Sequence, residues 1–186
     1  ARAADAGAHL WRTTPDVFDT WGSVTGCDKL HSAISCFQRS GRWNDPDMMI
    51  VGDVGWKSTQ RPSQLLPLEE QTHITLYAIL AAPMLLGCNL RTLRPDLLNM
   101  LTNEEVIAVN QDALGFSGKI VEEVLHTEVW LKALANGDVA LATINRGPFQ
   151  SHVHFEPANH GLQGRLSVKD LWTRESLGEI DKTLRI

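Results

Sequence analysis

Three short apolar runs in the first half of the chain constrain its fold most strongly. They read AHLW at residues 8–11, MMIVG at residues 48–52 and APMLLGC at residues 82–88, and each is continuous rather than alternating. Strands buried on both faces of a parallel sheet have this character, because helices cover both faces. We therefore expect an α/β region with parallel strands.

Helical patterns lie between and after these runs. The stretch PLEEQTHITLYAILAA predicts a helix, since Pro67 suits its first turn and Glu69 and Glu70 suit its positive end. Its apolar residues recur at helical spacing. The stretches RPDLLNML and NEEVIAVN predict two further helices, and Asn103 is the expected cap of the second.

Beyond about residue 115 the pattern changes to short β-type runs. These runs are TEVWLKAL, GDVALATINR, HVHFE, LSVKDLW and KTLRI, and they are divided by the turn-forming stretches ANG, RGP, ANHG and SLG. We expect an antiparallel β-module here. The predicted domains are residues 1–117, which carry the α/β pattern, and residues 118–186, which carry the β pattern.

Composition and charge exclude several classes of function. The net charge of -5 and the absence of a basic run argue against nucleic-acid binding. No apolar run approaches the roughly 20 residues that span a bilayer. No metal or other cofactor is expected, because neither a zinc-ligand pattern nor a glycine-rich nucleotide motif is present. Of the three cysteines, Cys27 and Cys36 either form a short-loop disulfide or, together with Cys88, are free buried thiols.

Two polar clusters are candidate sites. In LWRTTPDVFDTW, Asp16 either caps a helix that starts at Val17 or lies on a loop at the end of a strand, where α/β enzymes place catalytic groups. In RWNDPDMMIVGDVGW, Asp45 and Asp47 flank a proline, between Trp43 and Trp56. This second cluster is either a turn beside core tryptophans or part of a carbohydrate site, which combines carboxylates with an exposed indole face. Two acids are too few for calcium.

The order of the segments is more informative than any one of them. HLWRTTPDVFDTWGSV, WNDPDMMIVG, EEQTHITLYAILAAPMLLGCNL, NEEVIAVNQDALG and VKDLWTRESLG follow one another along the chain. In this order they resemble the C-terminal portion of glycoside hydrolase family 27, which contains α-galactosidases and α-N-acetylgalactosaminidases. The resemblance implies the last part of a (β/α)8 TIM barrel followed by an antiparallel β-sandwich. The runs that end at Arg12, Gly52 and Asn89 would be the sixth, seventh and eighth barrel strands.

The same resemblance implies roles for four residues. Asp16 matches the general acid/base of the family, and Arg12 matches an arginine that hydrogen-bonds sugar hydroxyls. Asp47 and Met48 match residues that line the sugar pocket, although ordinary core packing is the alternative for Met48. The implied partner is a carbohydrate with a terminal α-galactose.

The resemblance also implies that part of the site is missing. A retaining glycosidase needs two carboxyl groups about 5–5.5 Å apart, and the family's nucleophile, an aspartate on an earlier strand, matches nothing in these residues. We expect a fragment that is inactive alone, with an incomplete sandwich and an exported parent protein. The alternatives are a non-catalytic sugar-binding or structural module and, within the family, α-N-acetylgalactosaminidase or β-L-arabinopyranosidase activity. The sequence leaves the oligomeric state open.

Overall fold

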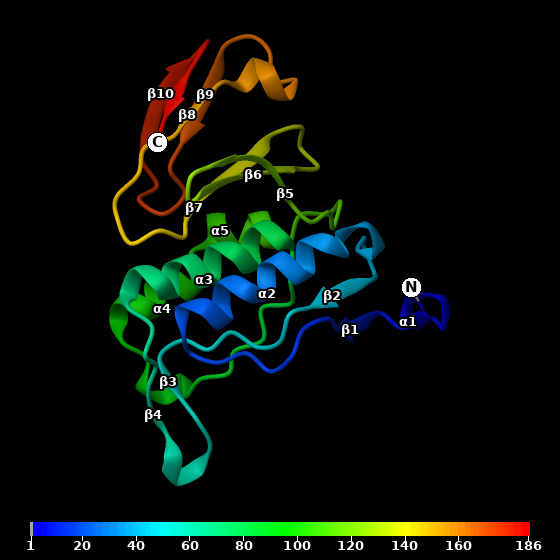
Figure 1. Cartoon of the computed structure of the whole chain (residues 1–186), viewed down its shortest axis with the longest axis vertical. Coiled ribbons are helices and arrows are strands. Elements are labelled where there is room, and N and C mark those ends of the chain that lie inside the picture. The colour runs from blue at the N-terminus through cyan, green and yellow to red at the C-terminus, as the bar shows by residue number, and fades with distance from the viewer. Residues whose placement is uncertain (1) are drawn as a thin grey trace.

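Two parallel strands, β1 (Leu10–Arg12) and β2 (Trp43–Asp45), pair residue for residue at the base of the fold. They belong to a computed structural model that describes residues 2–186, apart from the side chains at positions 2, 4, 27, 28, 32 and 57. A helical layer covers this strand pair, and the C-terminal sheets lie on the far side of the helices (Figure 1). The predicted α/β region followed by a β-module is confirmed.

The second strand lies earlier than the sequence predicts. The ladder runs through Trp43–Asp45, whereas the expected strand at 48–52 makes only one parallel bridge, between Met49 and Leu86. Pro46 cannot donate a ladder hydrogen bond, and the backbone at Asp47 has a φ of 91°, so the strand ends before the apolar run. The third run, at 82–88, contributes only the same bridge.

Residues 2–186 hold five α-helices, and three of them match the predicted ones. They are α1 (Arg2–Asp5), α2 (Trp21–Ala33), α3 (Pro67–Leu80), α4 (Pro95–Leu101) and α5 (Glu104–Asn110). The Glu69 carboxylate accepts a hydrogen bond from the backbone N–H of Leu66 at the start of α3. Asn103 caps α5, since its Oδ1 accepts from the backbone N–H groups of Glu105 and Val106.

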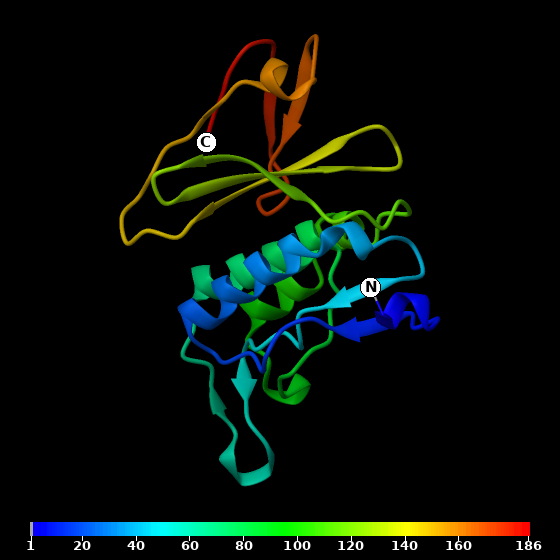
Figure 2. The same cartoon turned by 45° about the vertical axis from the view of Figure 1, so that its right-hand side comes forward.

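A short hairpin leaves the strand layer on the side away from the sandwich. It consists of β3 (Asp53–Val54) and β4 (Arg61–Pro62), joined by a 3-10 turn at Lys57–Thr59. Figure 2 shows this hairpin projecting from the body of the molecule. Three other 3-10 turns lie at Ser35–Phe37, Leu90–Thr92 and Pro157–His160.

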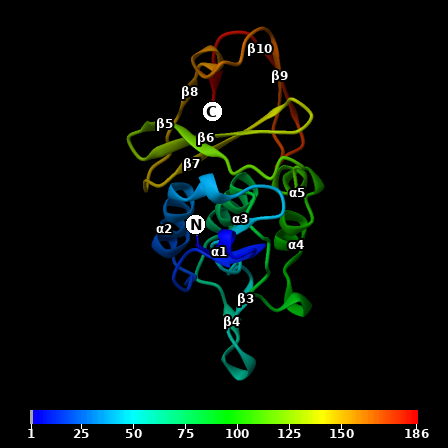
Figure 3. The ribbon, with the colours of Figure 1, turned by 90° about the vertical axis from the view of Figure 1, so that its right-hand side faces the viewer.

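The C-terminal part is built from antiparallel strands in two layers (Figure 3). The layer next to the helices holds β5 (Lys119–Val124), β6 (Thr127–Ala133) and β7 (Val139–Asn145) in that order. The outer layer holds two strand pairs. One pair is β8 (His154–Phe155) with β11 (Leu184–Arg185), and the other is β9 (Leu166–Lys169) with β10 (Ser176–Ile180). A small cluster of apolar residues, with Val129, Val153 and Phe155 at its centre, fills the space between the layers.

One strand lies where a turn was expected. The stretch SLG was interpreted as a divider, but it lies in β10, where the ladder has an irregularity between Ser176 and Gly178. Gly178 has a φ of 86°, which glycine adopts without steric cost. A glycine that permits a bulge has the same local signal as a glycine that ends a strand.

The main hydrophobic core joins the helices to the first sheet of the sandwich. Ile79 of α3 and Val109 of α5 share one buried cluster with Trp130 of β6 and Ile144 of β7. Lys132 of β6 is also buried, and its Nζ donates hydrogen bonds to the carbonyls of Ala78 and Val109 near the ends of α3 and α5. None of the described helices has the length and apolar character to span a bilayer.

Candidate active site

The candidate site lies beyond the carboxyl ends of β1 and β2. Because parallel strands present their carboxyl ends at one edge, the segments that follow Arg12 and Asp45 meet there. They border a pocket of about 720 Å³, whose wall includes Arg12, Asp16, Asp47, Met48, Trp56 and Arg61. All four of the predicted site residues therefore line one cavity.

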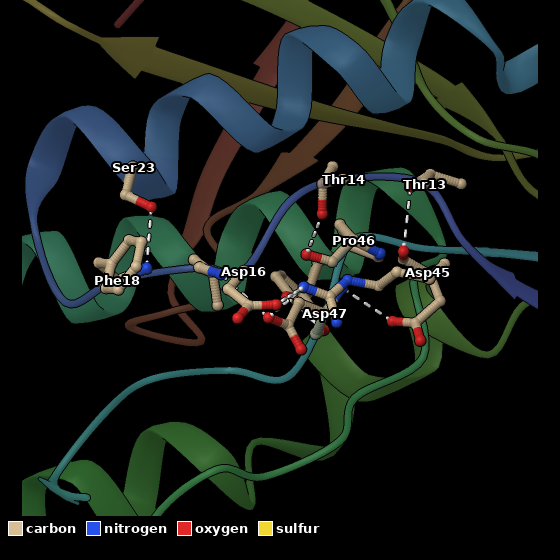
Figure 4. A network of polar contacts seen from close by, with 11 residues as sticks. Thr13, Thr14, Asp16, Phe18, Ser23, Asp45, Pro46 and Asp47 are labelled. Atoms are coloured by element: carbon tan, nitrogen blue, oxygen red, sulfur yellow. Dashed lines mark hydrogen bonds and ion pairs between the residues drawn. The ribbon is translucent and has the colours of Figure 1, made fainter.

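Arg12 lies between two carboxylates. Its Nη2 donates to Asp16 Oδ1 at 3.1 Å and to Asp47 Oδ2 at 2.6 Å. Figure 4 shows the Asp16 and Asp47 side chains converging on this point. Charge-assisted hydrogen bonds of this kind are stronger than neutral ones. The guanidinium therefore fixes the relative positions of two acids that lie 31 positions apart in the chain.

Asp47 is the most constrained residue of the site. Its Oδ2 also accepts from the backbone N–H of Val17 at 2.9 Å, and its own backbone N–H donates to Asp45 Oδ1 at 2.9 Å. Its carbonyl accepts from the hydroxyl of Tyr77 at 2.6 Å. A φ of 91° in a residue with a Cβ costs on the order of 1–3 kcal/mol. The surrounding hydrogen bonds hold the backbone in this unfavourable conformation.

Asp16 is held by its backbone while its carboxylate stays open to solvent. Its side chain is 85% exposed. Before it, Thr13 and Thr14 donate side-chain hydrogen bonds to the carbonyls of Asp45 and Pro46, at 3.0 and 2.8 Å (Figure 4). After it, Val17 is buried against Ile50 and Val54. A carboxylate that is fixed in place yet open to solvent suits proton exchange with a substrate and with water.

The helix-cap interpretation of Asp16 is wrong. Helix α2 begins at Trp21 rather than at Val17, and the Thr20 hydroxyl accepts the Ser23 N–H at 3.4 Å in the first turn. Asp16 lies on the loop that follows β1, as the alternative interpretation expected.

Met48 lines the pocket and also packs against its wall. A Cβ at Gly87 would lie 2.5 Å from the Met48 sulfur, so the glycine makes room for this side chain. Met48 is half-buried and lies outside the hydrophobic core clusters, so its place on the pocket wall is observed and its contact with a sugar stays a prediction. The two tryptophans that bracket the motif differ, because Trp43 is partly buried and Trp56 is 77% exposed on the pocket rim.

Helix α3 supports the site with polar groups that the sequence analysis treated as parts of an ordinary amphipathic helix. Buried Glu70 accepts from the Gly52 N–H at 2.8 Å and from Arg94 Nη2 at 2.6 Å. His73 Nε2 accepts from the Ile50 N–H at 3.1 Å, and burial lowers the pKa of His73 to about 4. Glu70, His73 and Tyr77 follow one another at helical spacing. This row of polar side chains on one face of the helix is the sequence pattern from which their supporting role could have been predicted.

Arg61 and Asp19 form a second ion pair that the sequence did not predict. Arg61 Nη1 and Nη2 donate to Asp19 Oδ2 and Oδ1 at 2.6 and 3.0 Å, and the backbone N–H of Gln64 donates to the same carboxylate at 2.8 Å. These hydrogen bonds hold the pKa of Asp19 well below its usual range. The pair ties the β3–β4 hairpin to the loop that carries Asp16.

The metal-ligating and thiol side chains that the structure describes lie apart from one another. Within that set, no group of three or more His, Cys, Asp or Glu side chains lies together to hold a metal ion. Cys36 is an exposed free thiol and Cys88 is a partly buried one, so the Cys27–Cys36 disulfide is wrong and so is the expected burial of these two free thiols. The Cys27 side chain lies outside the described part of the chain.

Comparison with known proteins agrees with the fold. Residues 3–112 match the family model described as Alpha galactosidase A, and residues 126–186 match the Alpha galactosidase C-terminal beta sandwich domain. The chain is 38% identical to the Alpha-galactosidase of Oryza sativa over 90% of its own length and 39% of the relative. It is 36% identical to the Alpha-N-acetylgalactosaminidase of Gallus gallus, over 89% of the chain and 40% of the relative.

A solved structure extends this comparison. The β-L-arabinopyranosidase of Geobacillus stearothermophilus superposes with a TM-score of 0.89 at 28% identity, over 96% of the chain and 42% of that protein. The fold and these matches together define a class of glycoside hydrolases that combine a TIM barrel with a β-sandwich. The 186 residues correspond to the C-terminal part of such a protein. The chain belongs to glycoside hydrolase family 27. It spans about two fifths of the length of the rice relative.

Proposed function

We propose that the whole protein is a retaining exo-glycosidase that removes terminal α-galactosyl residues, with Asp16 as its general acid/base. The carrying observation is the position of the Arg12 guanidinium between Asp16 and Asp47, at the carboxyl ends of two adjacent parallel strands. Arg12 and Asp47 then bind sugar hydroxyls, and Met48 forms part of the pocket wall. The names of the rice and chicken relatives support the choice of a galactose-type sugar.

In this proposal Asp16 acts twice. Its carboxyl group first donates a proton to the glycosidic oxygen as the bond to the leaving group breaks. The resulting carboxylate then takes a proton from the water that hydrolyses the glycosyl-enzyme. The backbone anchors on both sides of Asp16 limit its movement between the two steps, and positioning of this kind contributes strongly to rate.

We place the nucleophile outside these 186 residues. Asp47 Oδ2 already accepts hydrogen bonds from Arg12 and Val17, and the Asp45 carboxylate is buried and engaged with the backbone of Asp47. Asp53 accepts from the Thr92 hydroxyl at 2.5 Å and does not line the pocket. None of the three is free to attack an anomeric carbon beside Asp16.

The sugar preference has two alternatives within the family. The chicken relative is named for N-acetylgalactosaminidase activity and the Geobacillus protein for arabinopyranosidase activity. The three sugars share most of the hydroxyl pattern that Arg12 would contact. Rates on p-nitrophenyl α-galactoside, α-N-acetylgalactosaminide and β-L-arabinopyranoside, measured side by side, decide among them.

The acid/base role is tested with two leaving groups. In the whole protein, Asp16→Ala should reduce hydrolysis of raffinose, whose leaving group needs a proton, at least about a hundredfold. The rate at which p-nitrophenyl α-galactoside forms the glycosyl-enzyme should decrease much less, because nitrophenolate leaves without protonation. Asp181→Ala, at an exposed aspartate far along the chain, is the matched control and should change neither rate.

Assays of the 186-residue chain and of the whole protein, taken together, separate the enzyme from the alternative class. We expect it to bind galactose weakly without turnover, as a non-catalytic sugar-binding module would. Turnover by the isolated chain that Asp16→Ala abolishes would show that a second carboxylate here has replaced the nucleophile. Absence of turnover in the whole protein would contradict the enzyme assignment. Export from the cytoplasm stays a prediction, which cell fractionation tests.

A further inference from the structure

Trp56 is a large apolar side chain that the proposed chemistry leaves unused. It is 77% exposed at the tip of the β3–β4 hairpin and lines the same pocket as Asp16. Single exposed apolar residues are common on protein surfaces, but this indole lies on the wall of a pocket, where an aromatic face can contact a ligand. Its position on the rim of a sugar-type pocket gives it a candidate ligand.

The hairpin tip that carries Trp56 is ordered by its own hydrogen bonds. The backbone N–H of Thr59 donates to the Trp56 carbonyl at 3.0 Å, and the Thr59 hydroxyl donates to the same carbonyl at 2.6 Å. Gly55, with a φ of 98°, makes the turn possible, because a Cβ there would lie 2.7 Å from the Thr59 carbonyl oxygen. The indole therefore projects from a closed turn rather than from a loose loop.

Two contacts fix this hairpin relative to Asp16. Arg61 of β4 binds Asp19, three residues after Asp16, through two hydrogen bonds. Val54 of β3 packs with Ile50 and with Val17, the residue after Asp16. An ion pair and an apolar cluster thus join the base of the hairpin to the acid/base loop. The indole and the carboxylate form two fixed parts of one pocket wall.

The chemistry of this rim favours a neutral, polyhydroxylated ligand. The charge of Arg61 is compensated by Asp19, so the rim beside Trp56 carries no unpaired charge from this pair. Gln60 Oε1 accepts from Asn89 Nδ2 at 3.1 Å, and its amide nitrogen makes no hydrogen bond to any side chain or carbonyl in residues 2–186 that the structure describes. An aromatic face beside an amide donor matches a sugar ring, which offers a C–H face and hydroxyl acceptors.

We propose that Trp56 is the binding platform for the sugar residue attached through the anomeric oxygen of the galactosyl group, so that the protein selects oligosaccharides over simple galactosides. This proposal rests on the proposed function, because it takes the galactosyl ring to lie at Arg12 and Asp47. Trp56 then acts in substrate selection and not in proton transfer. The binding energy comes from the leaving-group sugar.

The test uses raffinose and methyl α-galactoside with the whole protein in an Asp16→Asn background, which keeps raffinose intact. Saturation-transfer difference NMR reports which sugar rings touch the protein, and titration gives both dissociation constants. We expect Trp56→Ala to raise the ratio of the raffinose constant to the methyl α-galactoside constant about tenfold. Saturation of the glucosyl ring should fall relative to the galactosyl ring. Trp56→Phe should keep most of the effect, and Phe149→Ala, at an exposed aromatic outside this pocket, should leave the ratio unchanged.

The outcomes separate this proposal from the proposed function. If the galactosyl ring is still saturated but the ratio of the two dissociation constants is the same with Trp56 and with Trp56→Ala, the role of Trp56 is overturned and the proposed function is not. Failure of the wild-type background to bind either sugar would contradict the proposed function, and the platform with it. A change in oligomeric mass on Trp56→Ala with an unchanged raffinose spectrum would overturn the platform and assign the indole to a contact between protein copies.

Discussion

The hydroxyl of Tyr77 donates a hydrogen bond to the backbone carbonyl of Asp47, with 2.6 Å between the two oxygens. Tyr77 is the sole tyrosine in the chain and lies on the buried face of α3. Asp47 holds Arg12, and Arg12 holds Asp16. A helix in the middle layer of the molecule is thus connected to the proposed acid/base through three successive hydrogen-bonded residues.

Tyr77→Phe tests this connection while keeping the aromatic ring. The variant leaves the Asp47 carbonyl without this donor, so we expect the free energy of unfolding to fall by about 1–2 kcal/mol. Galactose affinity should fall as well, because Asp47 gains freedom to move. Urea titration and calorimetry give the two values. An unchanged affinity at reduced stability would show that the hydroxyl supports the fold and not the pocket.

The backbone at Asp47 gives a second prediction. Asp47→Gly and Asp47→Ala both remove the carboxylate, but only alanine keeps a Cβ at a φ of 91°. We expect Asp47→Ala to be less stable than Asp47→Gly by about 1–2 kcal/mol, and Asp47→Asn to be the most stable of the three. Urea unfolding followed by tryptophan fluorescence measures the order. Equal stabilities of the alanine and glycine variants would mean that the backbone relaxes at this position.

Two buried histidines predict acid sensitivity. Burial lowers the pKa of His31 and of His73 to about 4, from an unfolded value of 6.5. Between these pH values the unfolded chain binds protons that the folded chain does not, so the free energy of unfolding decreases as the pH falls from 6.5 to 4. The full effect is on the order of 3 kcal/mol per histidine.

Unfolding measured at several pH values checks this slope. His73→Gln, whose side-chain oxygen can still accept the Ile50 N–H, should flatten it by about half. His154→Ala, at an exposed histidine of β8, should leave it unchanged. A slope that persists undiminished in His73→Gln would assign the acid sensitivity to other groups.

The shared core predicts that both structural parts unfold together. Trp130 and Ile144 of the sandwich lie in the same buried cluster as Ile79 and Val109 of the helices. We expect one transition, with coincident midpoints from far-ultraviolet circular dichroism and from tryptophan fluorescence. A piece ending at residue 117 should aggregate, since it exposes the apolar face of α3. Two separated transitions would contradict this coupling. The domain boundary between residues 117 and 118 itself stays a prediction.

Local signals in the sequence predicted most of the helices and part of the site. Pro67, Glu69 and Asn103 act at helix starts as their side chains suggest, because capping depends on neighbours three residues away. The order of the motifs predicted that Arg12, Asp16 and Asp47 share one pocket, and all three line it. The assignment of roles to these residues remains a proposal.

The features that the sequence missed depend on distant contacts or on the backbone. Tyr77 meets Asp47 across 30 positions and Arg61 meets Asp19 across 42, and neither pair has a short-range pattern. The second parallel strand ends at Asp45 because of backbone geometry at the next two residues, which an apolar-run argument does not consider. Strand β10 was not predicted because a glycine such as Gly178 is typical of turns as well as of irregular positions in a strand.

Helix α3 contacts the sandwich part through the carbonyls of Ala78 and Ile79, and it contacts Asp47 of the pocket wall through Tyr77. Lys132 of the sheet donates to the Ala78 carbonyl, one residue away from that tyrosine. The sandwich therefore supports the pocket through α3, although none of its side chains lines the pocket wall. We expect a chimera that receives its sandwich from a homologue to keep the position of Asp47 only if the new sheet makes the same contacts with α3.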